Sequence, residues 1–203
     1  MKIKNTQYRT AQAFTLIEMI GVLAVIAILA ALVLPKVFES INSARVNNAA
    51  VSYNTVKSAV TDHYAKFGSL LSSNGVVFTT AASVATNYDG LLLNEGFLDK
   101  KFQVKMGDTN SRVQVVTADI LSVAATAINA AHDLDGTVPV NDAVGGVVVQ
   151  AVIPGVAEAD AKDLNDRLDG ATLGTAIGTS DLVGRVKYAT GNPTTVYIYV
   201  THR

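Results

Sequence analysis

The chain has 203 residues, of which 49 % are hydrophobic and 16 % are charged, and its formal net charge at pH 7 is −1. This balance does not favour nucleic-acid binding, which usually needs a strongly basic face. The sequence contains no cysteine, which excludes disulfides and thiolate metal sites, and its length is compatible with one or two domains.

The first 13 residues form a short basic leader that contains Lys2, Lys4 and Arg9 and no acidic residue. An apolar run follows from residue 14 to residue 34, and its one charged residue is Glu18. About 20 apolar residues span a bilayer as a helix, so this run is long enough to cross a membrane. An isolated carboxylate inside such a helix costs about 2.5 kcal/mol or more. We therefore expect the Glu18 carboxylate to have a binding partner.

The junction Ala13-Phe14-Thr15-Leu16-Ile17-Glu18, followed by the apolar run and Pro35, resembles the class III signal of type IV pilins and pseudopilins. In that family a prepilin peptidase cuts before the Phe and methylates the new amino terminus, and the apolar helix stays on the mature protein. The resemblance implies cleavage between Ala13 and Phe14 and N-methylation of Phe14. It also implies that Glu18 and Pro35 act in assembly. Ala13 departs from the family, most of whose members have Gly at this position.

The resemblance implies a structural filament subunit that is not an enzyme and needs no cofactor. Its expected partners are further copies of itself, the prepilin peptidase, an assembly platform in the inner membrane, and membrane lipid before assembly. The precursor would reside in the inner membrane, and the assembled form would be an extracellular pilus or a periplasmic pseudopilus. Loss of the leader would leave 13 basic and 17 acidic residues, a formal charge of −4, so no nucleic-acid partner is expected.

Other interpretations of this segment are a secretory signal, a simple membrane anchor, a pseudopilin of a type II secretion system, and a membrane-anchored binding domain. A secretory signal has an apolar core of about 7 to 15 residues with the small-residue cleavage site after it. Here the apolar run is longer and the small residue precedes it. Neither a secretory signal nor a simple anchor accounts for Glu18 four residues after Phe14. Adhesion, twitching motility, DNA uptake and secretion all remain open as the role of a filament.

Residues 14 to 67 are predicted to form one long helix, with Gly68 as its C-terminal signal. Pro35 removes one backbone donor, so a kink or a locally melted stretch is expected between residues 27 and 35. Beyond Pro35 the apolar positions recur at spacings of three and four, which is typical of an amphipathic helix that packs on a core. These positions are Val37, Phe38, Ile41, Ala44, Val56, Ala59, Val60, Tyr64 and Phe67.

Residues 68 to 203 are predicted to form an α+β head with an antiparallel β-sheet against which the long helix packs. Strands are expected at 76–80, 113–117 and 147–153, and as a closing hairpin at 183–189 and 195–201. Helical segments are expected at 91–96, 118–131 and 156–168. The hairpin turn is expected at 190–193, which is rich in turn-forming residues.

One part of the head is similar to type IVb pilins, the class with larger heads. The expected strand at 147–153 continues through Pro154 and Gly155 into the expected helix. Type IVb pilins have a comparable strand, glycine-containing turn and helix. They usually place a cysteine early in that helix, where this chain has Ala161 and its neighbours.

Candidate ligands for metals or protons are few. His63, His132 and His202 are far apart in sequence and are expected at exposed positions on the surface. Asp133, Asp135 and Asp142 could offer oxygen ligands to Ca²⁺, but the EF-hand spacing with its bidentate Glu is absent. A solvated turn is the better interpretation, and no metal site is predicted.

Acidic residues recur every three positions in the expected helix at 156–168 and just after it, at Asp160, Asp163, Asp166 and Asp169. This spacing predicts one acidic ridge on the helix surface, which is usually solvated. In a filament such a ridge would face outward or meet a basic patch on a neighbouring subunit, for which Lys100 and Lys101 are candidates.

Overall fold

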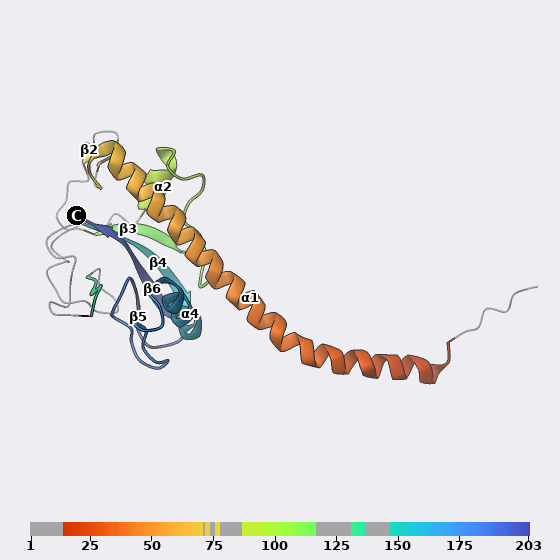
Figure 1. Cartoon of the computed structure of the whole chain (residues 1–203). Helices are drawn as coiled ribbons and strands as arrows, with labels where there is room; N and C mark the ends of the chain where they lie inside the picture. Colours follow the sequence, from red (N-terminus) through yellow and green to blue (C-terminus); the bar gives the residue numbers. More distant parts are fainter. Residues whose placement is uncertain (1–13, 71, 74–75, 78–86, 117–130, 137–146) are drawn as a thin grey trace, which may run out of the picture. The chain divides into compact units, whose positions relative to one another are not determined.

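The structure is a computed structural model that describes residues 14–70, 72–73, 76–77, 87–116, 131–136 and 147–203. Its elements are α1 (Leu16–Phe67), β1 (Ser72–Ser73), β2 (Val76–Val77), α2 (Tyr88–Asn94), β3 (Arg112–Val116), β4 (Val148–Val156), α4 (Glu158–Leu168), β5 (Val186–Tyr188) and β6 (Thr194–His202) (Figure 1). The long N-terminal helix and the antiparallel sheet confirm the predicted α+β class. The chain divides into two compact units, with the boundary between Ile41 and Asn42.

Helix α1 runs without interruption from Leu16 to Phe67 and contains Pro35 in its interior. The expected melted stretch before Pro35 is therefore absent from this helix, because proline removes one bond of the ladder and leaves the bonds on either side. The helix ends as predicted. Gly68 adopts a φ of 68°, and its N–H donates to the carbonyl of Tyr64 at 2.8 Å.

Within the head unit, one face of α1 is buried from Val46 onward. The buried side chains are Val46, Ala49, Tyr53, Val56, Ala59, Val60 and His63. The prediction that Val37, Phe38 and Ile41 pack on the core is wrong, since all three are exposed and Phe38 is 66 % accessible. These residues belong to the N-terminal unit, and no described residue of that unit covers them.

The main sheet has the strand order β3-β4-β6-β5, and every neighbouring pair is antiparallel. The central strand β4 pairs through Gln150 with Gln114 of β3, and through Ala151 with Ile198 of β6. Its first six residues are all buried, whereas buried and partly buried residues alternate along most of β6. The alternation in β6 was expected for a strand with one covered face.

Strand β4 begins one residue later and ends three residues later than the sequence predicts, because it continues through Pro154 to Val156. A register shift between Ile153 and Val156 marks a bulge opposite β6. Proline has no backbone N–H to donate to a neighbouring strand, and at this bulge none is required. The Pro154 carbonyl accepts a hydrogen bond from the Asp108 N–H at 2.9 Å. Gly155 follows with a φ of 73°.

The remaining predictions have mixed outcomes. The closing hairpin is confirmed, although its first strand β5 is limited to Val186–Tyr188. The helix expected at 91–96 begins earlier, as α2. The strand expected at 76–80 is described only at 76–77, where it forms β2, and the helix expected at 118–131 lies outside the described residues except for Ala131.

Asp89, at the start of α2, fastens two segments of the head. Its buried carboxylate accepts hydrogen bonds from the N–H of Phe102 at 3.2 Å and from the N–H of Val113 at 3.3 Å. The first bond holds the loop between α2 and β3, and the second holds β3 itself. One side chain therefore replaces two backbone acceptors that buried N–H groups need.

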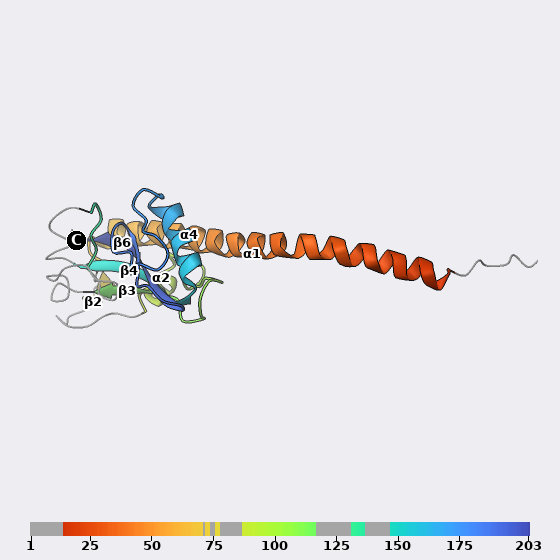
Figure 2. The ribbon, with the colours of Figure 1, turned by 90° about the horizontal axis from the view of Figure 1, so that it is seen from below.

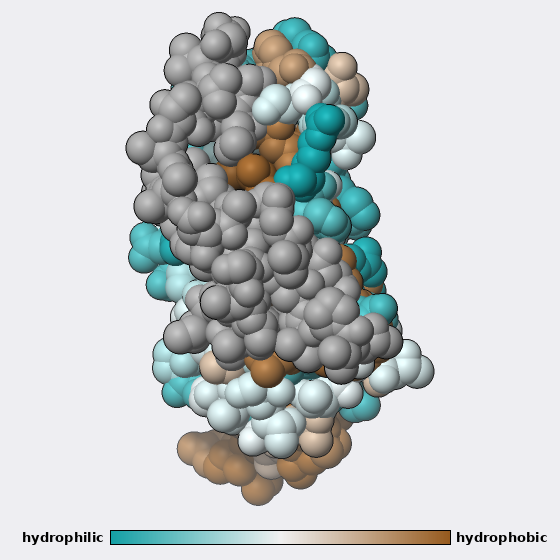
Figure 3. All heavy atoms as spheres, turned by 90° about the vertical axis from the view of Figure 1, so that its left-hand side faces the viewer, coloured by the Kyte–Doolittle hydropathy of each residue, from teal (hydrophilic) through white to brown (hydrophobic). Residues whose placement is uncertain are grey.

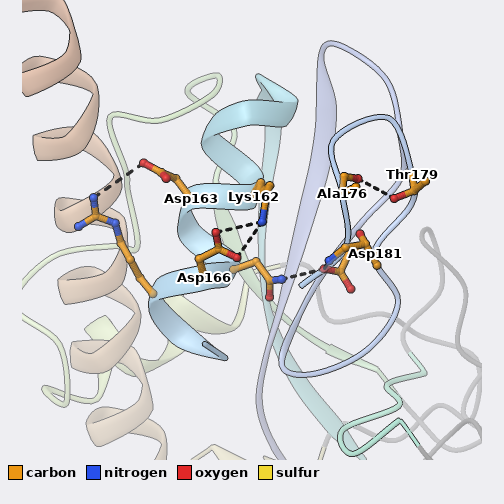
Figure 4. A network of polar contacts seen from close by, with 9 residues as sticks. Lys162, Asp163, Asp166, Ala176, Thr179 and Asp181 are labelled. Carbon is orange, nitrogen blue, oxygen red and sulfur yellow. Dashed lines mark hydrogen bonds and ion pairs between the residues drawn. The ribbon is translucent and has the colours of Figure 1, made fainter. Parts of the chain in front are cut away.

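Two further buried aspartates fasten the region after α4. Asp181 accepts bonds from the Asn165 side-chain amide at 2.7 Å and from the Thr175 N–H at 3.2 Å (Figure 4). Asp169, just past the end of α4, accepts the N–H of Val186 at 2.7 Å and so joins the helix end to β5. Such bonds to charged acceptors are stronger than neutral ones and serve a head without disulfides.

Lys187 in β5 is fully buried. Its ammonium group donates to the carbonyl of Ala131 and lies 5.8 Å from the centre of the Tyr197 ring. Burial lowers the pKa of Lys187 to about 7 from an ordinary value of 10.5. Between these values the unfolded chain binds more protons than the native one, so the free energy of unfolding rises with pH from about 7 towards 10.5.

We expect the full chain, unfolded in urea in detergent solution, to be more stable at pH 9 than at pH 7 by about 2 kcal/mol through this group. Lys187→Met keeps the length of the side chain and removes its titration, so it should abolish this part of the pH dependence. The measurement is the difference between the unfolding free energies of the two proteins at each pH. A difference that does not change with pH would contradict the assignment.

Candidate processing and assembly site

The start of α1 contains a local hydrogen-bond pair between Thr15 and Glu18. The backbone N–H and the hydroxyl of Thr15 both donate to Oε2 of Glu18, each at 2.8 Å. In return, the Thr15 hydroxyl oxygen accepts the N–H of Glu18 at 3.3 Å. This reciprocal arrangement is a capping box, which satisfies N–H groups that a helix start otherwise leaves without acceptors.

Glu18 was predicted from the sequence as a site residue, whereas Thr15 was not. The signal that could have found it is the T-x-x-E spacing of residues 15–18 directly before an apolar run. The capping box gives the Glu18 carboxylate a partner from its own chain. Its Oε1 atom receives no hydrogen bond from any described residue, so one acceptor remains available.

The apolar segment after the capping box is exposed throughout. Phe14 is 79 % accessible, and every residue from 14 to 41 is exposed. By length and composition, α1 is the one helix of the described residues that could cross a membrane, and its apolar window contains no buried residue. Water is a poor solvent for such a surface, so lipid or other apolar helices must cover it.

The residues predicted to act in processing and assembly are not all neighbours. Ala13 lies outside the described residues, whereas Phe14 and Glu18 lie within the first turns of the N-terminal segment. Pro35 follows 17 residues after Glu18 in the same helix, which is about 25 Å along the axis. Pro35 therefore cannot act on the same group as Glu18 within one chain.

The leader's end, the junction and the apolar run together correspond to a known sequence pattern. Residues 8–34 match the family described as the prokaryotic N-terminal methylation motif. The chain carries a class III methylation signal. No curated protein and no solved structure matches the chain.

The methylation signal confirms the resemblance to type IV pilins and pseudopilins in this segment. It supports a pilin-like or pseudopilin protein that is processed by a prepilin peptidase. Proteins with this signal are typically structural and not enzymes. Together with the exposed apolar helix, the signal is compatible with membrane anchoring of a precursor.

The head contains a buried row of three titratable side chains, Tyr88, His63 and Glu95, whose order is similar to that of a catalytic relay. The Tyr88 hydroxyl lies 3.2 Å from Nδ1 of His63, and Nε2 of His63 lies 3.2 Å from Oε2 of Glu95. The His63 ring also packs 5.5 Å from the ring of Phe97. Since His63 and Tyr88 are buried and Glu95 is nearly so, we interpret this group as a link between α1 and α2.

The expectation of exposed histidines is wrong for two of the three. His63 and His132 are both fully buried, and only His202 is exposed. His63 is buried because α2 supplies polar partners for it, and His132 because Gln150 of β4 lies 3.0 Å from its Nε2. Burial, reinforced by the charge of Lys187, lowers the pKa of His132 to about 3, so the ring is neutral at physiological pH.

A half-open pocket of about 290 Å³ lies between the last turns of α1 and the end of β6. It is lined by Val60, Thr61, Tyr64, Leu70, Thr201, His202 and Arg203. The guanidinium of Arg203 donates to the Tyr64 hydroxyl and to the Gly68 carbonyl, and so joins the two elements. Figure 3 shows hydrophilic (teal), intermediate (white) and hydrophobic (brown) residues side by side on the described part of this face.

The candidate calcium ligands are not assembled into a site within the described residues. Asp133 is buried, and its carboxylate accepts the Gly136 N–H at 2.7 Å, which closes a local turn. Its backbone also bonds Gly184 at 2.7 Å. Asp135 is exposed, and Asp142 lies outside the described residues. No cluster of three metal-ligating side chains occurs in the part of the chain that the structure describes.

The four periodic aspartates do not form the single solvated ridge that the sequence predicts. Asp166 pairs with Lys162 at 3.0 Å on the side of α4 that faces the loop carrying Asp181 (Figure 4). Asp169 is turned into the head, as described above. Only Asp160 and Asp163 remain near the surface beside α1. A spacing of three drifts around a helix of 3.6 residues per turn, which separates the four side chains.

Proposed function

We propose that the protein is a type IV pilin, the structural subunit of a pilus-like filament. The precursor is held in the inner membrane by residues 14–34 and is cut between Ala13 and Phe14 by a prepilin peptidase. Phe14 is then methylated on its amino group, and the mature chain polymerises through α1. In this proposal the protein is a substrate of an enzyme and not an enzyme, and its main partners are further copies of itself and the assembly platform.

The observation that carries this proposal is the exposed apolar helix that begins directly at the methylation signal. A bilayer covers such a helix before assembly, and the same segments of other copies cover it afterwards. Small residues let the helices approach closely. In the apolar run these are Gly21, Ala24, Ala27, Ala30 and Ala31. Gly21 itself has open space around the position of a Cβ atom in the single chain.

Glu18 supplies the specificity of this packing in the proposal. Cleavage creates a positively charged amine on Phe14, which methylation leaves charged. In apolar surroundings an unpaired charge is strongly destabilising, whereas a paired one sets the register between neighbours. The free Oε1 of Glu18 supports a contact with the amine of an adjacent subunit, while Oε2 stays in the capping box. Pro35 and the rest of α1 would pack alongside.

The test of the proposal is mass spectrometry of the mature amino terminus. We expect a first residue of N-methylated Phe14 in protein recovered from cells that contain a prepilin peptidase. Protein from cells without the peptidase should retain the leader and serves as the control. An intact Met1 in peptidase-containing cells, or a cut well beyond Leu34, would show that the protein is an ordinary anchored or secreted domain.

A pseudopilin of a type II secretion system is the second candidate, since the methylation signal is equally consistent with it. Immunogold electron microscopy of intact cells separates the two. Long surface filaments labelled for this chain support the pilin, whereas label confined to the periplasm supports the pseudopilin. The strand, glycine turn and helix formed by β4, Gly155 and α4 support a type IVb-like head within the pilin proposal.

A further inference from the structure

The loop between α2 and β3 places a row of lysines on one flank of α1. Buried and exposed residues alternate from 101 to 106, so Lys101, Gln103 and Lys105 point outward while Phe102 and its alternate neighbours point inward. Lys100 is exposed beside them. None of these lysines forms an ion pair with another described residue.

These lysines border two shallow grooves against α1. The larger has a volume of about 440 Å³ and is lined by Asn48, Lys100 and Lys105, among others. The smaller, about 160 Å³, adds Lys101 and the α1 side chain Val51. Asp108 also lines the larger groove and Asp99 the smaller one, and Val51 is 64 % exposed, so this flank combines three lysines with two aspartates and apolar surface. We call it the basic flank, defined by Lys100, Lys101, Lys105 and Val51.

The other flank of α1 carries α4, and it places the carboxylates of Asp160 and Asp163 near Arg45 and Arg167. The Asn42 side-chain amide donates to Asp160 at 2.7 Å, and Arg167 of α4 donates to the Ser43 hydroxyl at 2.9 Å, so this seam is fixed. Asp163 lies on the α1 side of α4 and its side chain is 58 % exposed (Figure 4). The Arg167 guanidinium lies 3.8 Å from its carboxylate and also binds Ser43 of α1. We call this surface the acidic flank, defined by Asp160 and Asp163.

The two flanks lie on different sides of α1. Residues 42, 43 and 47 contact α4, whereas residues 48, 51, 52 and 55 line the grooves of the basic flank. Successive residues of a helix are about 100° apart, so these two sets point in different directions from the helix axis. Figure 1 and Figure 2 show α2 nearer the C-terminal end of α1 and α4 nearer the point where α1 leaves the head.

We propose that the head of one copy docks its basic flank on the acidic flank of the next copy, with Lys101 and Lys105 facing Asp160 and Asp163. This inference rests on the proposed function, since it describes how adjacent subunits of the filament meet. Two different surfaces that face different directions form a heterologous contact, and such contacts generate open helical polymers when they do not close into a ring. We choose a second copy of the chain as the binding partner because every copy carries both the basic flank and the acidic flank.

The charge state of the acidic flank supports this pairing. Burial, together with the neighbouring Asp163 carboxylate, raises the pKa of Asp160 above its usual value. The two carboxylates therefore repel each other in the single chain, and the charge of Arg45 opposes this effect only in part. A lysine of a neighbouring copy would relieve that repulsion, and charge complementarity of this kind fixes register and excludes wrong partners more than it adds affinity.

The absence of cysteine makes a direct test possible. In the full chain, Lys101→Cys and Asp163→Cys are introduced together, and sheared filaments are treated with a short bismaleimide. This reagent is preferred because a lysine–aspartate pair holds Cα atoms farther apart than the roughly 7 Å that a disulfide allows. We expect a ladder of dimers, trimers and longer species, because each copy is linked on both flanks. Each single variant should give no ladder.

The matched control combines Lys101→Cys with Thr190→Cys, an exposed position on neither flank, and should stay monomeric. Filaments of the Lys101 and Asp163 double variant that also stay monomeric would overturn the inference while leaving the pilin assignment intact. If wild-type cells produce no filament or pseudopilus containing this chain, the proposed function itself fails. The two failures are therefore distinguishable.

A charge exchange provides a second readout that does not depend on cross-linking. Lys101→Glu alone, or Asp163→Lys alone, should lower the recovery of filaments by about tenfold, since each places like charges opposite each other. The two changes in one chain should restore recovery to within about twofold of wild type. A double variant as deficient as the worse single variant would show that the two residues do not meet.

Discussion

Replacing Glu18 by Gln is expected to leave cleavage and methylation of Phe14 unchanged and to lower filament yield by about a hundredfold or more. The glutamine keeps the size of the side chain and an oxygen that accepts the Thr15 N–H, so the capping box survives. What it removes is the negative charge. The amine of the neighbouring subunit would then be buried without a partner, which costs about 3–5 kcal/mol, and each 1.4 kcal/mol is a factor of ten.

The matched control is Thr15→Ala, which keeps the charge of Glu18 and removes the hydroxyl of the capping box. Loss of such a cap costs about 1 kcal/mol, so filament yield should fall by less than tenfold. Yield is measured by quantitative immunoblotting of the sheared fraction, and processing by mass spectrometry. If Thr15→Ala proved as harmful as Glu18→Gln, or if the latter assembled normally, Glu18 would be a helix cap and not an assembly residue.

Replacing Asp89 by Ala is expected to destabilise the head by about 3–5 kcal/mol. The change leaves the buried N–H groups of Phe102 and Val113 without their acceptor. Hydrogen bonds to charged groups contribute about 1.5–3 kcal/mol each, and an unsatisfied buried donor adds a further penalty. The loop that carries the basic flank is held by the first of these bonds, so it should loosen together with the sheet edge at β3.

Thermal unfolding of the full chain in detergent measures this effect. The chain has seven tyrosines and no tryptophan, so tyrosine signals in near-ultraviolet circular dichroism report on the head. Asp99→Ala is the control, because Asp99 is exposed in the same loop region and forms no ion pair with another described residue. Such surface changes usually alter stability by less than about 0.5 kcal/mol. Equal midpoints for the two variants would contradict the role of Asp89.

Much of the fold could be predicted from local pattern. The apolar run, the amphipathic spacing beyond it and Gly68 define α1, and alternation defines β6. Long-range contacts decided what the pattern missed. Strand β4 passes Pro154 because Asp108, distant in sequence, bonds its carbonyl. His63 and His132 are buried because side chains of α2 and β4 supply polar partners for them. The sequence around each histidine does not indicate these partners.

The methylation signal was more predictable from the sequence than the head. Phe14 and Glu18 follow from the order of leader, junction and apolar run, which is a local signal that the methylation motif matches. The role of Thr15 was accessible from spacing alone and was overlooked. The prediction of an acidic ridge was wrong because the spacing of the aspartates does not reveal their binding partners. Asp166 pairs with Lys162, whereas Asp169 points into the head and accepts a hydrogen bond from β5. These outcomes depend on neighbours that only the folded chain supplies.

Because the head contains no cysteine, its stability should not depend on the redox state of its surroundings. Its loops are fastened by carboxylates of Asp89, Asp169 and Asp181, not by sulfur. The chain therefore needs no thiol oxidase or disulfide isomerisation to fold, and a strong reductant such as dithiothreitol has no disulfide to break. If the protein forms the proposed filament, we expect that filament to stay intact in anoxic, sulfide-rich surroundings, where heads that depend on disulfides would unfold.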